Sequence, residues 1–227
     1  KKNYETAESY FRKALAVNPS YKEALYGLGM VYGYQNQYEI AHSYLSKALD
    51  INPGFLTAWK WRGIVSYEMK NFEAAVDDFS NGLALDPANA DLFARRGRTH
   101  FLAGNGASAL QDLLLARKFT PENSRIMLYL AEVYHQQGES TIALETLSEA
   151  LTLNPDYADA LALQGEIYRD QNKLEDAESS YRKALDATQY RPERYLVPLA
   201  QILMDQDKVD IAYKLIDARQ KEINSAE

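Results

Sequence analysis

The stretch KEALYGLGMVYGYQNQYEIAHSYLSKALDINPGF, residues 22–55, contains two amphipathic helix patterns. In its first half Leu28 and Tyr32 are four residues apart and share one face of a predicted first helix. In its second half Ala41 and Leu45 mark a second helix. A short polar turn separates the two patterns. An Asn-Pro pair closes the second helix, because proline cannot continue it.

The same unit recurs along the chain. Five prolines stand 34 residues apart: Pro19, Pro53, Pro87, Pro121 and Pro155. The same spacing connects a series of small residues, Ala7, Ala41, Ala75, Ala109, Ala143 and Ala177. It also connects a series of large apolar or aromatic residues, Phe11, Leu45, Phe79, Leu113, Leu147 and Tyr181. A third series comprises Gly29, Gly63, Gly97, Ala131 and Gly165. The small residues let the two helices approach closely, and each hairpin needs a neighbour to cover its remaining apolar face.

These series divide the chain into a half unit and six full units. The predicted repeats form a single array over residues 1–227, with boundaries at 1–21, 22–55, 56–89, 90–123, 124–157, 158–192 and 193–227. The half unit is a second helix without its first helix. We expect an upstream helix of a longer parent protein, or alternatively another chain, to cover its apolar side. In the last unit Pro198 removes a backbone hydrogen bond from the first helix.

The run Trp59, Arg62-Gly63, Ala75, Phe79 and Pro87 resembles the tetratricopeptide repeat pattern W-x2-L-G-x2-Y, A-x3-F, P. The resemblance implies an all-α fold, a right-handed α-α superhelix of six and a half helical hairpins. It also implies a protein-protein interaction scaffold or adaptor, with no cofactor, that holds a peptide in a concave groove lined by first helices.

The helical period then indicates which first-helix side chains face that groove. The predicted peptide-binding residues are Tyr26, Met30, Tyr34, Lys60, Trp61, Ile64, Tyr67, Arg95, Arg98, Arg125, Tyr129 and Glu132. They are aromatic at the start, basic in the middle and acidic at the end, which suits a partner segment with an acidic element. The alternative interpretation is a solvated face whose charges pair with one another. Arg62 and Arg96 are weaker candidates, because their stems can pack on neighbouring residues.

One subclass of the resembled family carries a clamp that grips the carboxylate tail of a chaperone. Lys60 and Arg125 match two clamp positions. Ile64, Arg95 and Tyr129 stand where the clamp requires Asn, Asn and Arg. The sequence therefore disfavours a chaperone-tail receptor.

The composition disfavours several other functions. A formal charge of −7 is opposite to what a nucleic-acid backbone attracts. The chain has no cysteine, and His42, His100 and His135 have no matched second ligand in the repeat frame, so neither a metal site nor an active site is predicted. No apolar run approaches the roughly 20 residues that cross a bilayer. We expect a soluble, non-enzymatic protein, cytoplasmic or periplasmic.

The tyrosines invite a second interpretation, base stacking with single-stranded nucleic acid. Most occupy the aromatic positions of the repeat and are predicted to be core or half-core residues, among them Tyr10, Tyr32, Tyr134, Tyr168 and Tyr181. Packing therefore accounts for them.

A rival function remains open at this stage. The array would be the self-assembly or regulatory module of a larger enzyme or of a secretion or assembly machine. In that case oligomer contacts would form through the uncovered N-terminal end.

Overall fold

A computed structural model describes residues 3–188 and 193–225, and all regular secondary structure in these ranges is α-helical. The helices alternate along the chain. The half unit is α1 (Tyr4–Val17). The first helices of the pairs are α2 (Lys22–Tyr34), α4 (Leu56–Glu68), α6 (Ala90–Leu102), α8 (Ser124–Gln136), α10 (Ala158–Asp170) and α12 (Glu193–Asp205). The second helices are α3 (Tyr38–Ile51), α5 (Phe72–Leu85), α7 (Gly106–Phe119), α9 (Ser140–Leu153), α11 (Leu174–Asp186) and α13 (Val209–Ser225).

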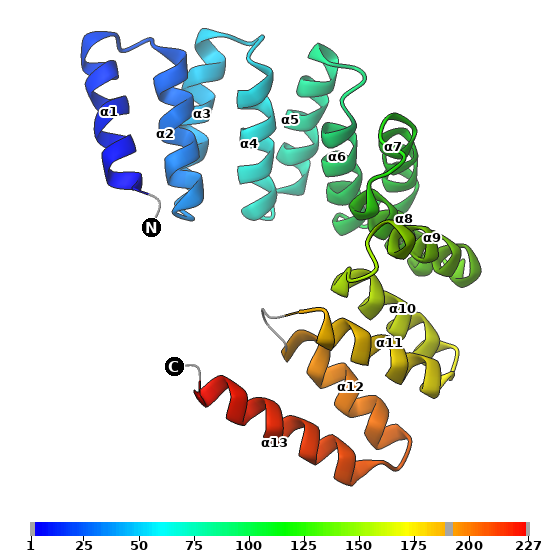
Figure 1. Cartoon of the computed structure of the whole chain (residues 1–227). Coiled ribbons are helices and arrows are strands. Elements are labelled where there is room, and N and C mark those ends of the chain that lie inside the picture. The colour runs from blue at the N-terminus through cyan, green and yellow to red at the C-terminus, as the bar shows by residue number, and fades with distance from the viewer. Residues whose placement is uncertain (1–2, 189–192, 226–227) are drawn as a thin grey trace. The chain divides into compact units, whose positions relative to one another are not determined.

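Each first helix packs against the second helix that follows it, so the described chain consists of α1 and six helical hairpins (Figure 1). The predicted fold class, an all-α tetratricopeptide-type solenoid of six and a half hairpins, is confirmed. The turn inside each hairpin has one residue with positive φ. These residues are Asn36, Lys70, Gly104, Gly138, Asn172 and Asp207. A left-handed residue directly after a helix is a common way to end it.

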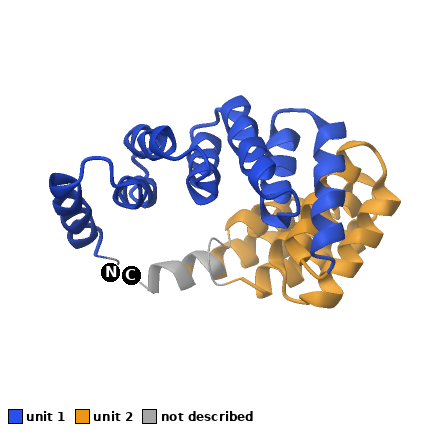
Figure 2. Ribbon diagram, turned by 90° about the horizontal axis from the view of Figure 1, so that it is seen from above, with its two compact units in different colours: residues 1–121 blue, residues 122–227 orange. Residues whose placement is uncertain are grey.

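The chain divides into two compact units (Figure 2). Unit 1 covers residues 1–121 and contains α1 to α7. Unit 2 covers residues 122–227 and contains α8 to α13. The single array over the whole chain stays a prediction.

Close contact between the two helices of a hairpin depends on the small residues of the first helix. A Cβ atom added to Gly29 would stand 2.5 Å from Cγ of Leu45. One added to Gly63 would stand 2.6 Å from the Phe79 ring. No side chain fits at such distances, so glycine is required for the observed approach of α2 to α3 and of α4 to α5.

The core of unit 1 near its start shows how consecutive hairpins join. Leu28 and Tyr32 of α2 are buried together with Ala41 and Leu45 of α3 and with Val65 of α4. Helix α2 therefore lies against both α3 and α4, and its apolar side is closed by the hairpin that follows. Unit 2 repeats this arrangement, with Ala143 and Leu147 of α9 and Ile167 of α10 among its fully buried residues.

Tyr10 is not a core residue, because 67% of it is exposed. Its counterpart one period later, Tyr44, stacks on Tyr32 of α2, and no helix precedes α1 in the described chain to give Tyr10 such a partner.

Pro198 lies inside α12, as the sequence predicts. Residues 189–192, where the sixth repeat was expected to end, lie outside the described residues.

Candidate protein-interaction face

The predicted binding residues of unit 1 lie on α2, α4 and α6, and all are at least partly open to solvent. We call this set the first-helix face: Tyr26, Met30, Tyr34, Lys60, Trp61, Ile64, Tyr67, Arg95 and Arg98. Helices α2 and α4 contact each other, so side chains from consecutive repeats meet on this face. The first-helix face carries both partly exposed aromatic rings and basic side chains.

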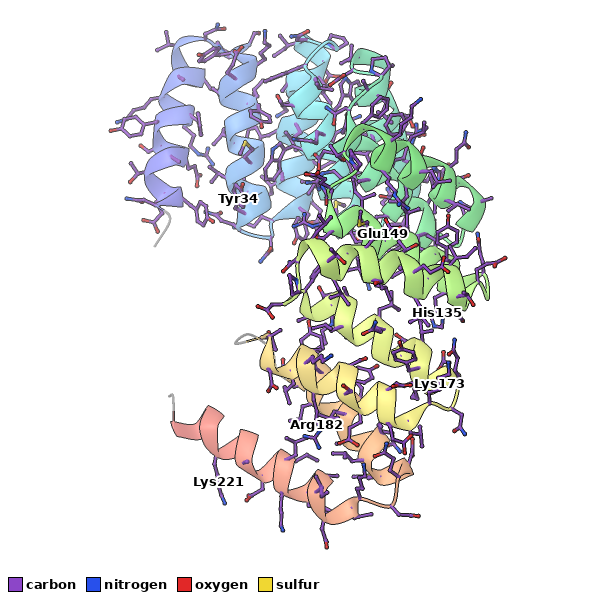
Figure 3. All side chains as sticks on the ribbon, turned by 45° about the vertical axis from the view of Figure 1, so that its right-hand side comes forward. Tyr34, His135, Glu149, Lys173, Arg182 and Lys221 are labelled. Atoms are coloured by element: carbon purple, nitrogen blue, oxygen red, sulfur yellow. The ribbon has the colours of Figure 1, made fainter. Side chains whose placement is uncertain are left out.

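An aromatic chain crosses the start of the face. Tyr34, which is 45% exposed, lies at the end of α2 (Figure 3). Its ring meets Trp61 of α4 edge to face at 5.1 Å between centroids, and it stacks on Tyr4 of α1 at 6.1 Å. Partly exposed aromatic rings that already hold one another in place lose little conformational freedom on binding, which makes them good anchors.

Tyr26 and Tyr67 are held by neighbouring rings. Tyr26 packs on Phe55 with the centroids 5.1 Å apart, and Tyr67 packs on Phe72 at 6.0 Å. Burial raises the pKa of Tyr26 above its usual value, so its hydroxyl stays neutral at physiological pH. Both rings stiffen the face, although less of each is available to a partner.

The basic part of the face is partly neutralised from within. The carboxylate of Asp91 on α6 accepts hydrogen bonds from Nε of Arg95 at 3.0 and 3.1 Å, and Nζ of Lys60 on α4 lies 3.6 Å from it. Arg98 lies over the ring of Phe101 at 5.1 Å. Two cations, Lys60 and Arg95, thus share the Asp91 carboxylate. Exposed ion pairs contribute only about 0–1 kcal/mol, so a ligand carboxylate can replace Asp91 at little cost.

The remaining predicted residues belong to unit 2. Arg125 is exposed on α8, whereas Tyr129 and Glu132 of the same helix are half-buried. Arg125 interacts with the hydroxyl of Tyr157, whose pKa is raised mainly by burial. Each unit therefore holds its own part of the predicted set, and a binding surface that includes both parts stays a prediction.

Arg62 and Arg96 connect helices instead of facing a partner. Arg62 of α4 donates to the carboxylate of Asp78 on α5 at 2.7 Å and to the hydroxyl of Ser46 on α3 at 3.0 Å. Arg96 repeats this with Asp112 and Ser80 at 2.8 and 2.9 Å. Burial raises the pKa of Asp78, and the bonds from Arg62 offset part of that rise.

The sequence analysis expected only that the stems of these two arginines pack on neighbouring residues. The repeat pattern nevertheless contains a sign of the hydrogen-bond network. Its members recur with the 34-residue period, from Ser46, Arg62 and Asp78 to Ser80, Arg96 and Asp112. Each arginine joins a second helix of one hairpin to both helices of the next. We therefore assign these two arginines to the junctions between hairpins.

The histidines occupy structural positions. His42 and His100 are half-buried, and burial lowers the pKa of each below its ordinary value. His135 at the end of α8 has Nε2 3.3 Å from Asp170 of α10, a carboxylate neighbour that the repeat frame did not predict. Within residues 3–188 and 193–225, no group of three or more His, Asp or Glu side chains is arranged to hold a metal ion.

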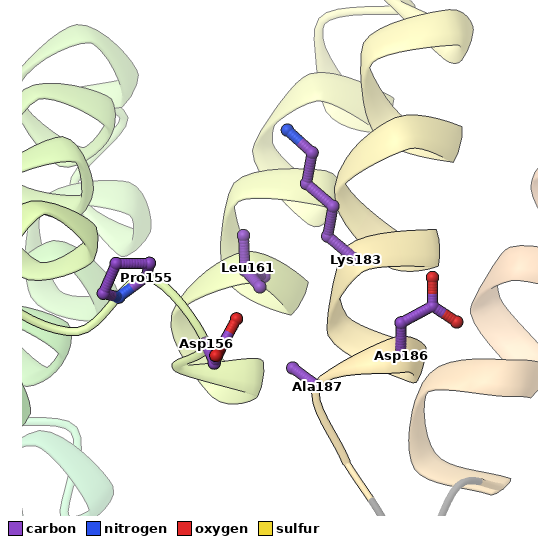
Figure 4. A pocket seen from close by; sticks show the side chains of 6 residues that line it. All are labelled: Pro155, Asp156, Leu161, Lys183, Asp186 and Ala187. Carbon is purple, nitrogen blue, oxygen red and sulfur yellow. The ribbon is translucent and has the colours of Figure 1, made fainter.

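A polar pocket lies in unit 2 between the turn after α9 and the end of α11 (Figure 4). Its volume is about 370 Å³, and its lining residues are Pro155, Asp156, Leu161, Lys183, Asp186 and Ala187. One ammonium group and two carboxylates are the charged groups of this lining. None of the helices in the described residues is both long and apolar enough to cross a membrane.

Comparison with known families agrees with the repeat pattern. Two family models described as tetratricopeptide repeat match the chain, one over residues 2–32 and 136–192 and the other over residues 23–55. The chain therefore contains tetratricopeptide repeats. A search among curated proteins gave no match to the sequence. The family and the fold support a protein-interaction scaffold in general terms.

Several solved structures have the same fold, and one of them, YrrB, is described as a tetratricopeptide repeat protein. PilW, described as a widely conserved type IV pilus biogenesis factor, has a TM-score of 0.78 at 18% identity, over 89% of this chain and 94% of that one. PilF of Pseudomonas aeruginosa has a TM-score of 0.72 at 21% identity, over 91% and 97%. YrrB, described as having an unusual peptide-binding site, has a TM-score of 0.63 at 23% identity, over 80% and 93%. At these identities the likeness establishes a shared fold.

Proposed function

We propose that the chain is a protein-interaction scaffold that binds a peptide segment of a partner on the first-helix face of unit 1. The observation that carries the proposal is the exposed aromatic chain of Tyr34 and Trp61 beside the cations Lys60 and Arg95. Apolar side chains of the ligand pack on the rings. An acidic group of the ligand displaces Asp91 from the cations.

The chemistry of this face defines the ligand. The guanidinium groups of Arg95 and Arg98 can each bind a carboxylate through two hydrogen bonds, which a lysine cannot do. A segment with a bulky apolar residue followed by acidic residues satisfies both parts of the face. Because the charges are solvent-exposed, its affinity falls as ionic strength rises.

A selection experiment tests this proposal. A random 16-residue peptide library displayed on phage is selected against the immobilised chain, and the enriched peptides are synthesised and titrated. We expect enrichment of sequences that combine bulky apolar and acidic residues. Reversal of both charges, Arg95→Glu with Arg98→Glu, should weaken their binding at least about tenfold.

The matched control has the same change of charge on second helices, Lys47→Glu with Lys118→Glu, at two exposed positions. It should leave the affinity within about twofold. The proposal is wrong if no sequence class is enriched, or if both double variants bind the selected peptides equally well.

A further inference from the structure

The polar pocket of unit 2 lies where the repeat pattern lacks a large side chain. The second helices α3, α5, α7 and α9 each end on a large apolar residue, and these residues are 34 positions apart: Ile51, Leu85, Phe119 and Leu153. The next residue in this series is Ala187. Helix α11 ends at Asp186, so Ala187 is its C-cap and replaces a bulky side chain with a methyl group.

The fourth repeat shows what a large side chain does at this place. Phe119, at the end of α7, stacks on Phe93 of α6 with the ring centroids 6.0 Å apart. The counterpart of Phe93 in the sixth repeat is Leu161 of α10, which lines the pocket together with Ala187. Because the methyl group of alanine is small, it leaves space beside Leu161. The pocket of about 370 Å³ therefore includes the place of a large apolar side chain, and its size suits a small molecule.

The charged groups around this space have opposite signs and come from different elements. Figure 4 shows the turn residue Asp156 on one side of the pocket and the α11 residues Lys183 and Asp186 on the other, with Leu161 between them. Within residues 3–188 and 193–225 the side chains of Asp156 and Lys183 make neither a hydrogen bond nor an ion pair. The pocket thus offers an ammonium group and a carboxylate to a ligand, beside an apolar floor.

These features define the chemistry of the ligand. A simple cation would leave Lys183 without a partner, and a simple anion would leave Asp156 without one. A molecule that carries both an ammonium group and a carboxylate can pair with both residues. Exposed ion pairs contribute little each, so an apolar part that fills the space beside Leu161 must supply much of the affinity.

We propose that this pocket binds a free α-amino acid with a large apolar side chain. The ammonium group of the ligand pairs with the carboxylate of Asp156, and its carboxylate pairs with Nζ of Lys183. Its side chain packs on Leu161 in the space beside Ala187, as Phe119 packs on Phe93 in the fourth repeat. The site lies in unit 2 and shares no residue with the first-helix face.

Titration of the full chain with L-leucine tests the proposal, with backbone amide chemical shifts as the signal. We expect saturable shifts centred on Asp156, Leu161 and Ala187, with a dissociation constant below about 10 mM. Three analogues each remove one feature of the ligand. N-acetyl-L-leucine lacks the ammonium group, L-leucinamide lacks the carboxylate and L-alanine lacks the large side chain. Each should bind at least about tenfold more weakly than L-leucine.

Two variants test the residues of the pocket. Ala187→Leu restores the side chain of the earlier repeats, so it should fill the pocket and weaken leucine binding at least about tenfold. Lys183→Ala should weaken it to a similar extent, because the ligand carboxylate loses its partner. The matched controls are Ala218→Leu and Lys214→Ala at exposed positions of α13, and both should leave the affinity within about twofold. Circular dichroism checks that every variant is folded.

Four results would overturn the proposal. The first is a dissociation constant for L-leucine above about 10 mM. The second is equal affinity for L-leucine and L-leucinamide, which would assign the pocket to the first residue of a peptide. The third is equal affinity of the Ala187→Leu and Ala218→Leu chains. The fourth is a nuclear Overhauser effect between the Ala187 methyl group and a side chain of residues 189–192 in the unliganded chain, because the chain would then fill the pocket itself.

Discussion

Arg62 and Arg96 show how single side chains hold consecutive hairpins together. Each guanidinium connects three helices, and its carboxylate partner is almost fully buried, with 4% of the Asp78 side chain and 6% of the Asp112 side chain exposed. The planar group also lies over an aromatic ring, Trp59 for Arg62 and Phe93 for Arg96. A lysine could not make these contacts at once.

Removal of one arginine should therefore be costly. We expect Arg62→Ala to lower the free energy of unfolding by about 3 kcal/mol, because Asp78 is left buried without its partner. Urea unfolding followed by circular dichroism measures the loss. Lys47→Ala, an exposed cation on α3, is the control and should change stability by less than about 0.5 kcal/mol. A loss below about 1 kcal/mol for Arg62→Ala would contradict the assignment.

The two histidines of unit 1 predict how stability depends on pH. The folded chain lowers the pKa of His42 and His100 by burying them, so unfolding allows them to take up protons near pH 6.5. Their contribution is present above pH 6.5 and is lost as the pH falls below it. The free energy of unfolding should drop between pH 6.5 and 5, and His42→Gln with His100→Gln should reduce that drop. An unchanged slope in the double variant would contradict this explanation.

Sequence reasoning succeeds where a feature follows the 34-residue period. Prolines and small residues mark the hairpins because every repeat has the same steric need, and the Arg62–Asp78 pair recurs with the same spacing. The contact between His135 and Asp170 was not predicted, because the two residues are 35 positions apart and do not occupy equivalent places in the 34-residue repeat. The exposure of Tyr10 was missed for a different reason. A repeat pattern describes the residue but not whether a neighbouring helix is present to cover it.

Helix α12 departs most from its sister elements. Its proline, Pro198, is half-buried in the sixth position of the helix and cannot donate to the carbonyl of Arg194. The rest of the helix is well packed, since Leu199, Ile202 and Leu203 are fully buried. Tertiary packing thus maintains the helix despite the lost hydrogen bond.

Replacement of this proline should strengthen unit 2. We expect Pro198→Ala to raise the free energy of unfolding by about 1–3 kcal/mol, because the missing hydrogen bond forms and helix propensity improves. Pro87→Ala, in an exposed turn of unit 1, is the control and should have no stabilising effect. Destabilisation by Pro198→Ala, measured in the same urea experiment, would show that the proline ring contributes essential packing.

At the scale of the two compact units, contacts between neighbouring helices dominate. Within each unit the hairpins pack on their neighbours along the chain, and among the described residues helices from distant repeats supply none of the principal contacts. Proteins of this kind have stabilities that approximate a sum over repeats and the junctions between them. The two compact units should therefore be able to fold separately.

We expect fragments 1–121 and 122–227 each to be helical and to unfold cooperatively. Circular dichroism and nitrogen–proton correlation spectra test this, and most peaks of each fragment should coincide with those of the full chain. A fragment with poorly dispersed peaks would show that its hairpins depend on the other unit.

The most direct test of the proposed function maps the site of a selected peptide. Backbone amide chemical shifts of the full chain are recorded during titration with a peptide from the phage library. We predict that the largest shifts fall on α2, α4 and α6, around Tyr34, Trp61 and Arg95. Shifts confined to the second helices α3, α5 and α7 would contradict the account.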